Sequence, residues 1–369
     1  MIYLDNGATS LRKPPAVGIA MEQALRFCAN PGRGGHEASM RAGRIVYHCR
    51  EVASQLFQCR PEQVVFTANC THELNIAINS VVKHGGRVAV SGFEHNAVMR
   101  PLYALNAKII PCGRKLFDWE DTLRDFEEAI KAGVDAVVCT HVSNVFGYIL
   151  PVEQIARLCE MYGVPFILDA AQSAGTLPVE LEKMHAAFIA MPGHKGLLGP
   201  QGTGLLLCGG ECEPLLYGGT GTDSRARWMP ESLPERLEAG TLNVPGIAGL
   251  AAGLSYLLNH GIEGIHKKEA LQAQRCAGIL AQKGMKVFYG PHQSGTVSFV
   301  PEMDCEEMAS VLAMRGIAVR AGLHCAPMAH ESAGTLESGT VRISFGYDAA
   351  PWQTNRFLKV MALDNGDVM

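Results

Sequence analysis

Short apolar runs alternate with longer amphipathic stretches between residues 64 and 208. Short apolar runs bounded by turn residues predict strands, and the amphipathic stretches between them predict helices. Strands are expected at 64–67, 87–91, 108–110, 134–139, 165–168, 186–191 and 205–208. Helices are expected at 73–82, 96–105, 118–131 and 152–162. This alternation predicts a mostly parallel sheet with helices on both faces.

The alternation weakens on both sides of this region. Residues 14–53 read as mostly helical, with a glycine-rich loop at 30–36, and two further loops are expected at 218–223 and 237–245. A long helix is expected at 247–282, followed by strands at 296–300, 318–320 and 341–345 and helices at 305–314 and 352–362. We therefore predict a large α/β domain at 14–246 and a smaller α+β domain formed by 1–13 with 247–369.

Composition removes several classes of function. The chain has 369 residues and a formal net charge of −4, so no basic surface favours nucleic acid or an anionic membrane. No apolar run is long enough to span a bilayer, and the amino terminus lacks the pattern of a secretory signal. The twelve cysteines are scattered without a CxxC pair, which predicts free thiols in the cytoplasm and no metal site.

Polar side chains follow the predicted strands, where the carboxyl ends of parallel strands meet at one edge of a sheet. They include Thr71, His95, Asn144 and Asp169, and Lys195 stands between glycines after a further strand. Each has an ordinary explanation, such as a helix cap for Thr71 or a tight turn around Lys195. Their shared position favours a ligand site.

A lysine, a carboxylate after a buried strand, a histidine and an anion-binding turn suit pyridoxal phosphate. This cofactor needs an amine for a Schiff base, a carboxylate beside its ring nitrogen, a phosphate cradle and a surface for its ring.

Six motifs occur in the order typical of one family: YLDNGAT at 3–9, EH at 94–95, DAAQS at 169–173, GHK at 193–195, EAGT at 238–241 and RAGLHCAP at 320–327. The chain resembles the cysteine desulfurases of the class V aminotransferase family, in the branch with a short cysteine loop that includes selenocysteine lyase-like members. The resemblance runs nearly end to end. It implies the fold of fold-type I pyridoxal-phosphate transferases, with a seven-stranded type of sheet in the large domain.

The resemblance also implies roles for individual residues around the cofactor. Lys195 would hold it as a Schiff base and later move the substrate α-proton. Asp169 would pair with the ring nitrogen, and His95 would stack on the ring. Gln172 would bond the ring oxygen, with Asn144 beside it near the substrate.

Other implied roles concern the phosphate, the substrate and the partner subunit. Thr71 and His194, with the turn that contains Cys70, would hold the phosphate at a helix start. Thr241 would reach the phosphate of the neighbouring subunit, which implies a homodimer. The substrate-binding residues would be Arg342, which would clamp the carboxylate, together with Asn144 and His36.

Cys325 would attack the substrate sulfur and become a persulfide, and the neighbouring His324 would help to activate it. The implied reaction converts L-cysteine to L-alanine and passes sulfur to an acceptor protein, as in iron–sulfur cluster assembly. Selenocysteine lysis, cysteine sulfinate desulfination and transamination remain alternatives with the same fold and cofactor. A catalytically silent scaffold is a further alternative, although it would have no need of Lys195, Asp169 and Arg342.

Three residues depart from the family pattern. Pro192 stands where many relatives carry serine or threonine, so one phosphate contact is expected to be lost or replaced. Cys70 stands where relatives often have threonine, and Gly7 replaces an alanine. None of the three removes a catalytic group.

Overall fold

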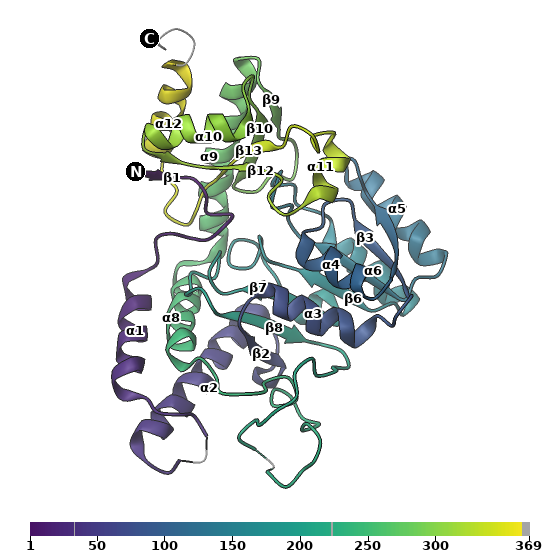
Figure 1. Ribbon diagram of the computed structural model, residues 1–369, viewed down its shortest axis with the longest axis vertical. Helices are drawn as coiled ribbons and strands as arrows, with labels where there is room; N and C mark the ends of the chain where they lie inside the picture. Colours follow the sequence, from purple (N-terminus) through teal and green to yellow (C-terminus); the bar gives the residue numbers. More distant parts are fainter. Residues whose placement is uncertain (33, 223, 364–369) are drawn as a thin grey trace.

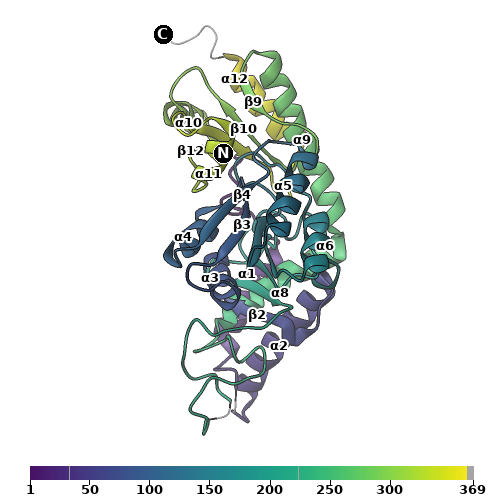
Figure 2. The same ribbon diagram turned by 90° about the vertical axis from the view of Figure 1, so that its right-hand side faces the viewer.

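The computed structural model describes residues 1–32, 34–222 and 224–363. Two bodies are stacked along the long axis of the molecule (Figure 1), with the larger sheet in the lower body and the smaller sheet in the upper one. The long helix α9 (Ile262–Gln282) runs along one side of both bodies. Figure 2 shows the same stacking from the side.

The large sheet contains seven strands in the order β2-β8-β7-β6-β5-β3-β4 within the described residues. Its members are β2 (Val64–Thr67), β3 (Arg87–Ser91), β4 (Lys108–Cys112), β5 (Ala136–Thr140), β6 (Phe166–Asp169), β7 (Phe188–Pro192) and β8 (Gly204–Cys208). Neighbouring strands from β4 to β7 pair in parallel, and β8 runs antiparallel between β2 and β7. The prediction of a mostly parallel, seven-stranded sheet flanked by helices is therefore confirmed.

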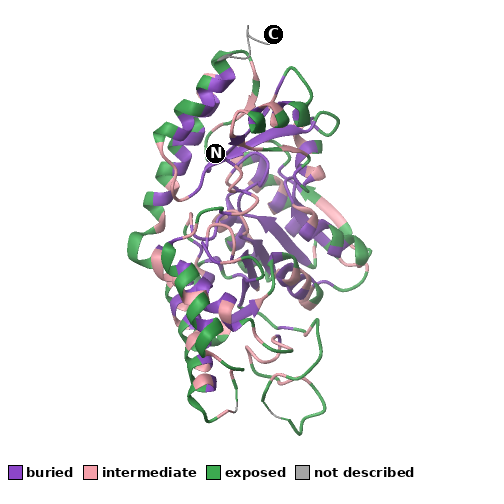
Figure 3. Cartoon of the chain, turned by 60° about the vertical axis from the view of Figure 1, so that its left-hand side comes forward, coloured by how far each residue is buried: buried purple, intermediate pink, exposed green. Residues whose placement is uncertain are grey.

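Helices cover both faces of this sheet because each presents one apolar side to it. They are α1 (Pro15–Phe27), α2 (Glu37–Phe57), α3 (Cys70–Val81), α4 (Asn96–Ala104), α5 (Trp119–Lys131), α6 (Val152–Tyr162), α7 (Leu181–Met184) and α8 (Val244–His260), with a 3₁₀ turn at Pro61–Gln63. Helix α3 begins three residues earlier than expected, because the Asn69 side chain accepts a hydrogen bond from His72 N and caps it. Figure 3 shows that most of the sheet is buried, whereas the edge strand β4 is largely intermediate or exposed.

The smaller body is built on an antiparallel sheet in the order β12-β13-β10-β9. Its elements are β9 (Lys286–Phe288), β10 (Thr296–Val300), α10 (Cys305–Met314), β12 (Arg320–Gly322), α11 (Pro327–Ala333), β13 (Thr340–Ser344) and α12 (Pro351–Leu363). Strand β1 (Ile2–Tyr3) pairs with β11 (Ile317–Ala318), so the amino terminus joins this body. The sequence reading missed β1, β9 and α11.

The prediction of one continuous helix at 247–282 is wrong, because two helices occupy this segment. Gly261 adopts a φ of +73° and divides the segment into α8 and α9. Helix α8 packs in the same core as the large sheet, whereas Ala273 and later residues of α9 belong to the core of the smaller body. We propose that the domain junction lies within α9 rather than at residue 246.

Candidate active site

A cavity of about 250 Å³ opens at the carboxyl edge of the large sheet, between the two bodies. Ten of the twelve residues predicted for the site line it: Cys70, Thr71, His95, Asn144, Asp169, Gln172, His194, Lys195, Cys325 and Arg342. They come from loops after different strands, as expected for a doubly covered parallel sheet. The other two, His36 and Thr241, lie outside it.

Asp169 is the last residue of β6 and is almost completely buried. Its Oδ1 atom accepts hydrogen bonds from Ala171 N at 2.9 Å and from the Cys70 thiol at 3.7 Å. Its Oδ2 atom accepts none from the residues that the structure describes. Burial raises the pKa of Asp169, and the nearby Lys195 acts against that rise. A cationic group in the cavity beside Oδ2 would stabilise the carboxylate.

The Cys70 side chain lies against Asp169. The sequence predicts that backbone amides of the turn containing Cys70 hold a phosphate, and in the structure the Cys70 thiol donates to the Asp169 carboxylate. Only the backbone N–H of Cys70 is available at the helix start.

Lys195 lies in the loop after β7 and extends into the same cavity. Burial lowers the pKa of Lys195, whereas the nearby Cys70 and Asp169 act against that fall. Its Nζ atom makes no hydrogen bond or ion pair with the described residues. A buried amine with a lowered pKa and no partner is suited to act as a nucleophile or base.

His95 caps α4 and its orientation is fixed by that cap. Its Nδ1 atom accepts a hydrogen bond from Ala97 N at 3.0 Å, which places the ring proton on Nε2. Burial, followed by the charge of Lys195, lowers the pKa of His95 to about 4. The ring is therefore neutral at neutral pH and presents an uncharged surface to the cavity.

The start of α3 offers an anion site at another wall of the cavity. The N–H groups of Cys70 and Thr71 have no partner among the described residues, because the Asn69 cap serves His72 instead. His194 lies nearby in the lining, and its Nδ1 atom is 3.0 Å from the Thr9 hydroxyl. Burial lowers the pKa of His194 to about 4, so it would contribute a hydrogen bond and not a charge.

Arg342 on β13 is buried and partly engaged within the protein. Its Nη1 atom donates to the backbone oxygen of Asn144 at 2.9 Å, and Nη2 pairs with Asp5 Oδ1 at 2.6 Å. Its Nε atom is buried and has no partner among the described residues. The sequence reading expected an open fork for a substrate carboxylate and missed Asp5, which already occupies part of it.

Gly7, one of the departures from the family pattern, is explained by this arginine. A β-carbon at position 7 would lie 3.1 Å from Arg342 Cζ and 3.2 Å from Ser344 Oγ. Those distances are shorter than ordinary van der Waals contact, so glycine provides the room in which Arg342 reaches Asp5.

Cys325 lies on the loop between β12 and α11, and this loop faces the cavity from the smaller body. Its thiol side chain is exposed. His324 and Cys325 both adopt positive φ angles, +50° and +58°, a conformation that costs energy for residues other than glycine. The loop is held by hydrogen bonds from Asn96 N to the Cys325 oxygen and from Asn144 Nδ2 to the His324 oxygen, both 2.8 Å.

The His324 ring is hydrogen-bonded to Thr340, and this does not fit the role in activating the Cys325 thiol that the sequence suggested. Its Nε2 atom is 3.2 Å from both oxygens of Thr340, and burial strongly lowers the pKa of His324. The ring is neutral and makes no hydrogen bond with Cys325 in the described structure. The hypothesis that His324 activates the thiol is therefore not supported, and the cationic residue missed in this lining is Arg320.

Thr241 and His36 belong to a different part of the surface. Thr241 lines a larger cavity of about 750 Å³ together with residues 30–32 and 219–222. His36 caps α2 at the end of the adjacent loop, where its ring accepts a hydrogen bond from Ser39 N. The intervening Glu238 is buried and fixed by Arg50 Nη2 at 2.6 Å and by Phe66 N at 2.7 Å.

These features agree with the motifs of a known family. The family model described as Aminotransferase class-V matches residues 2–356. The chain belongs to the aminotransferase class-V family. The pairing of a buried carboxylate with a half-buried lysine at the edge of this sheet agrees with that membership.

Several relatives are similar over almost their whole length. The chain is 35% identical to a probable cysteine desulfurase of Pyrococcus abyssi, covering 98% of this chain and 93% of the relative. It is 34% identical to a probable cysteine desulfurase of Methanothermobacter thermautotrophicus, covering 94% and 90%.

Solved structures agree with the fold. The apo cysteine desulfurase of Thermococcus onnurineus NA1 superposes with a TM-score of 0.90 at 33% identity, covering 98% of this chain and 93% of that one. The cysteine desulfurase CsdA of Escherichia coli superposes with a TM-score of 0.86 at 26% identity, covering 98% and 94%. Within the described residues, no helix is long and apolar enough to cross a membrane.

Proposed function

We propose that the protein is a pyridoxal-phosphate-dependent cysteine desulfurase, which converts L-cysteine to L-alanine and leaves a persulfide on Cys325. One observation carries the proposal: an exposed cysteine lines the same cavity as the buried Asp169 and the half-buried Lys195. The similarity to proteins named cysteine desulfurases supports it.

The residues of the cavity fit the cofactor. Among the described residues, one Asp169 oxygen, the Lys195 amine and the N–H groups at the α3 start have no partner, and they would meet the ring nitrogen, the cofactor aldehyde and the phosphate. The neutral His95 ring would face the cofactor ring, and Gln172 would lie at its edge. When bound, pyridoxal phosphate supplies the electron sink for bond breaking at the substrate.

Two side chains would carry the chemistry. Lys195, whose pKa is lowered by burial, takes the proton from the substrate α-carbon and later returns a proton. The Cys325 thiolate attacks the substrate sulfur, so that an S–S bond forms as the bond from sulfur to the β-carbon breaks. The electron pair of the broken bond stays with the carbon, which takes up a proton to give alanine. The atoms balance without a further reactant.

Arg342 would bind the substrate carboxylate beside Asn144. Because Asp5 holds one side of the guanidinium, the substrate would meet Nε and the remaining N–H groups, or displace Asp5. A charge-assisted contact of this kind fixes the orientation of the substrate.

A homodimer would explain why Thr241 and His36 lie outside the cavity. The loop at 212–240 exposes the large apolar side chains Leu216, Tyr217 and Trp228. Exposed apolar groups gathered in one region are typical of an interface between subunits. We propose that this region, with Thr241 and His36, faces the active site of the partner subunit.

The persulfide would pass to an acceptor protein, for example in iron–sulfur cluster assembly. The free cysteines of the described residues agree with a reducing cytoplasm, which is our proposal for its location.

The test incubates the purified protein, loaded with pyridoxal phosphate, with L-cysteine and measures alanine and sulfide with and without a thiol reductant. We expect equal amounts of alanine and released sulfur, with sulfide release depending on the reductant. Pyruvate in place of alanine would contradict the proposal and indicate elimination.

A further inference from the structure

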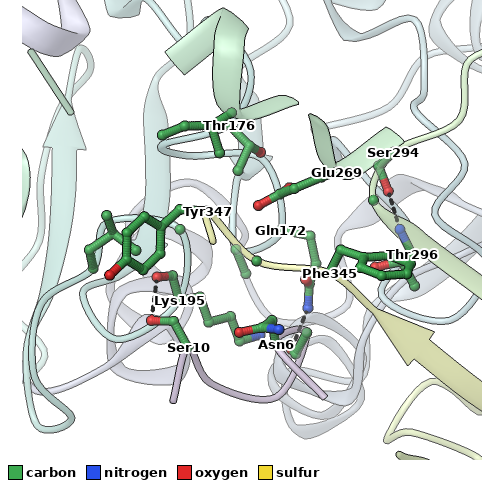
Figure 4. Close-up of a pocket in the computed structure, with 17 residues that line it drawn as sticks. Asn6, Ser10, Gln172, Thr176, Lys195, Glu269, Ser294, Thr296, Phe345 and Tyr347 are labelled. Atoms are coloured by element: carbon green, nitrogen blue, oxygen red, sulfur yellow. Dashed lines mark hydrogen bonds between the residues drawn. The ribbon is translucent and has the colours of Figure 1, made fainter. Parts of the chain in front are cut away.

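A smaller cavity, of about 50 Å³, lies where five parts of the chain meet (Figure 4). These parts are the amino-terminal segment, the loop after β6, the Lys195 loop, helix α9 and the strand ends of the smaller body. The cavity shares Gly7, Ala171, Gln172 and Lys195 with the active-site cavity. Its polar lining includes Asn6, Ser10, Thr176, Glu269, Ser294 and Tyr347. None of these six has a role in the proposed reaction.

Glu269 is the titratable carboxyl side chain of this cavity, and the proposed reaction gives it no role. Its side chain comes from α9 and extends into the cavity (Figure 4), although the residue is only 7% exposed. It makes no hydrogen bond or ion pair with any residue that the structure describes. Burial, with a further contribution from Asp348, raises the pKa of Glu269 to about 8. A buried carboxylate without a partner is costly, so an occupant of opposite charge would be strongly favoured.

The oxygen atoms of the two amide side chains of the lining accept no hydrogen bond from the described residues. Asn6 donates its Nδ2 to the Ser344 oxygen at 3.1 Å, and Gln172 donates its Nε2 to the Gly7 oxygen at 2.9 Å. Because both partners are carbonyls, the amide assignments are fixed. The remaining atoms, Oδ1 and Oε1, can only accept.

The hydroxyl protons of Ser10 and Thr176 in the lining are also used in hydrogen bonds within the protein. Ser10 Oγ lies 3.0 Å from the backbone oxygens of both His194 and Lys195, and Thr176 Oγ1 donates to the Ser173 oxygen at 3.0 Å. A hydroxyl has one proton, and each of these protons is used on a carbonyl. Thr176 Oγ1 keeps a lone pair, whereas Ser10 Oγ already accepts a hydrogen bond from Lys13 Nζ. The lining therefore combines a carboxylate with three neutral acceptors.

Oxygen ligands of this kind suit a hard cation, and a single carboxylate matches a single positive charge. Among the described residues, no group of three or more His, Cys, Asp or Glu side chains is arranged to hold a metal ion, which disfavours a transition metal at this place. We propose that the cavity is a binding site for a monovalent alkali cation, K⁺ or Na⁺, held by Glu269. The ion would join the amino-terminal segment, the Lys195 loop and α9. This site does not depend on the proposed function.

The test measures thermal unfolding of the protein in KCl, NaCl or choline chloride at one ionic strength. Choline is too large for the cavity and controls for general salt effects. We expect one alkali ion to raise the melting temperature saturably, by on the order of 2–4 °C over choline. In Glu269→Gln this difference should disappear. Glu263→Gln, a change at an exposed position of the same helix, should keep it.

Equal melting temperatures in all three salts would overturn the proposal, and so would an undiminished effect in Glu269→Gln. The first result would indicate that Glu269 is protonated and bonded to water. If Glu269→Gln does not fold, Thr176→Val decides, because it removes one ligand oxygen at nearly constant volume. We expect its half-saturating cation concentration to rise several-fold, and an unchanged value would contradict the site. Crystals soaked in Tl⁺ should show the ion beside Glu269, and Tl⁺ bound only elsewhere would exclude it.

Discussion

The two halves of the active-site cavity differ in how their side chains are held. On the side of the large sheet, Asp169, His95 and Lys195 are mostly buried, and the first two are fixed by short hydrogen bonds to backbone N–H groups. On the side of the smaller body, Cys325 is exposed on a loop with two successive positive φ angles. The rigid half suits a cofactor that must not move. The other half suits a thiol that receives sulfur at the cavity and releases it to an acceptor.

The comparison assigns separate tasks to the two halves. The sheet side would determine which cofactor binds, and the cysteine loop would determine which reaction follows. Substitutions in each half should therefore affect cofactor binding and sulfur transfer separately.

Lys195→Ala should have the largest effect. We expect cysteine turnover to fall by about 10³-fold or more, because the variant loses both the covalent anchor and the base. The absorption band of the covalently held cofactor should also disappear. Far-ultraviolet circular dichroism of the variant is the control for folding. Turnover within tenfold of the parent would show that Lys195 is not the anchor.

Cys325→Ala tests the side of the cavity that the smaller body forms. We expect it to keep the cofactor band and to lose desulfuration of L-cysteine by about 10²-fold or more. Cys28→Ala, at another partly accessible cysteine, is the matched control and should remain active. Measuring selenocysteine turnover in parallel separates the alternatives, since retained activity there would indicate a selenocysteine lyase.

Asp169→Asn should weaken the binding of pyridoxal phosphate by roughly 10–100-fold. This expectation follows from the loss of one hydrogen bond to a charged group, worth about 1.5–3 kcal/mol. Fluorescence titration of the apoprotein with the cofactor measures the affinity. Unchanged affinity would mean that Asp169 does not face the ring nitrogen.

Gly7→Ala tests the position of Arg342. The new β-carbon would press on the guanidinium, so we expect KM for L-cysteine to rise about five- to tenfold with a smaller change in kcat, as for a loss of about 1 kcal/mol of binding. Gly18→Ala, in α1 with open space around it, should leave both constants unchanged. An equal rise of KM in both variants would contradict the claim that Gly7→Ala acts through Arg342.

The last prediction concerns acid stability on the sheet side, and not the reaction. Burial lowers the pKa of His141 from 6.5 to about 4, and its Nδ1 atom has no partner in the part of the chain that the structure describes. Between these pH values the unfolded chain binds a proton that the folded chain does not, so unfolding becomes easier as pH falls from 6.5 to 4. The loss is on the order of 3 kcal/mol. In denaturant titrations at several pH values, His141→Gln should flatten this decline, and the exposed His48→Gln should not.

The sequence predicted much of the fold because the alternation of apolar runs is local and strong. All seven strands of the large sheet were found, and their carboxyl ends brought together the predicted lining. The missed elements were short: β9 has three residues and α11 seven. For α11 a signal was present, since Pro327 at its first position and Gly334 after its end mark a helix.

Other features depend on contacts between distant segments. Asp5 and Arg342 are separated by 337 positions, and no local pattern indicates that they pair. The direction of the Cys70 thiol toward Asp169 is likewise set by the packing of α3 on the sheet. The bond between the His324 ring and Thr340 follows from the positive φ angles of the cysteine loop, which a sequence without glycine at those positions does not predict.

The most direct test of the account follows sulfur to Cys325. The protein loaded with pyridoxal phosphate is incubated with one equivalent of L-cysteine, alkylated, digested and analysed by mass spectrometry. We expect one added sulfur atom on the peptide that contains Cys325, with an equal amount of alanine, and no such addition in Cys325→Ala. Alanine formed in full while Cys325 carries no added sulfur would contradict the central claim.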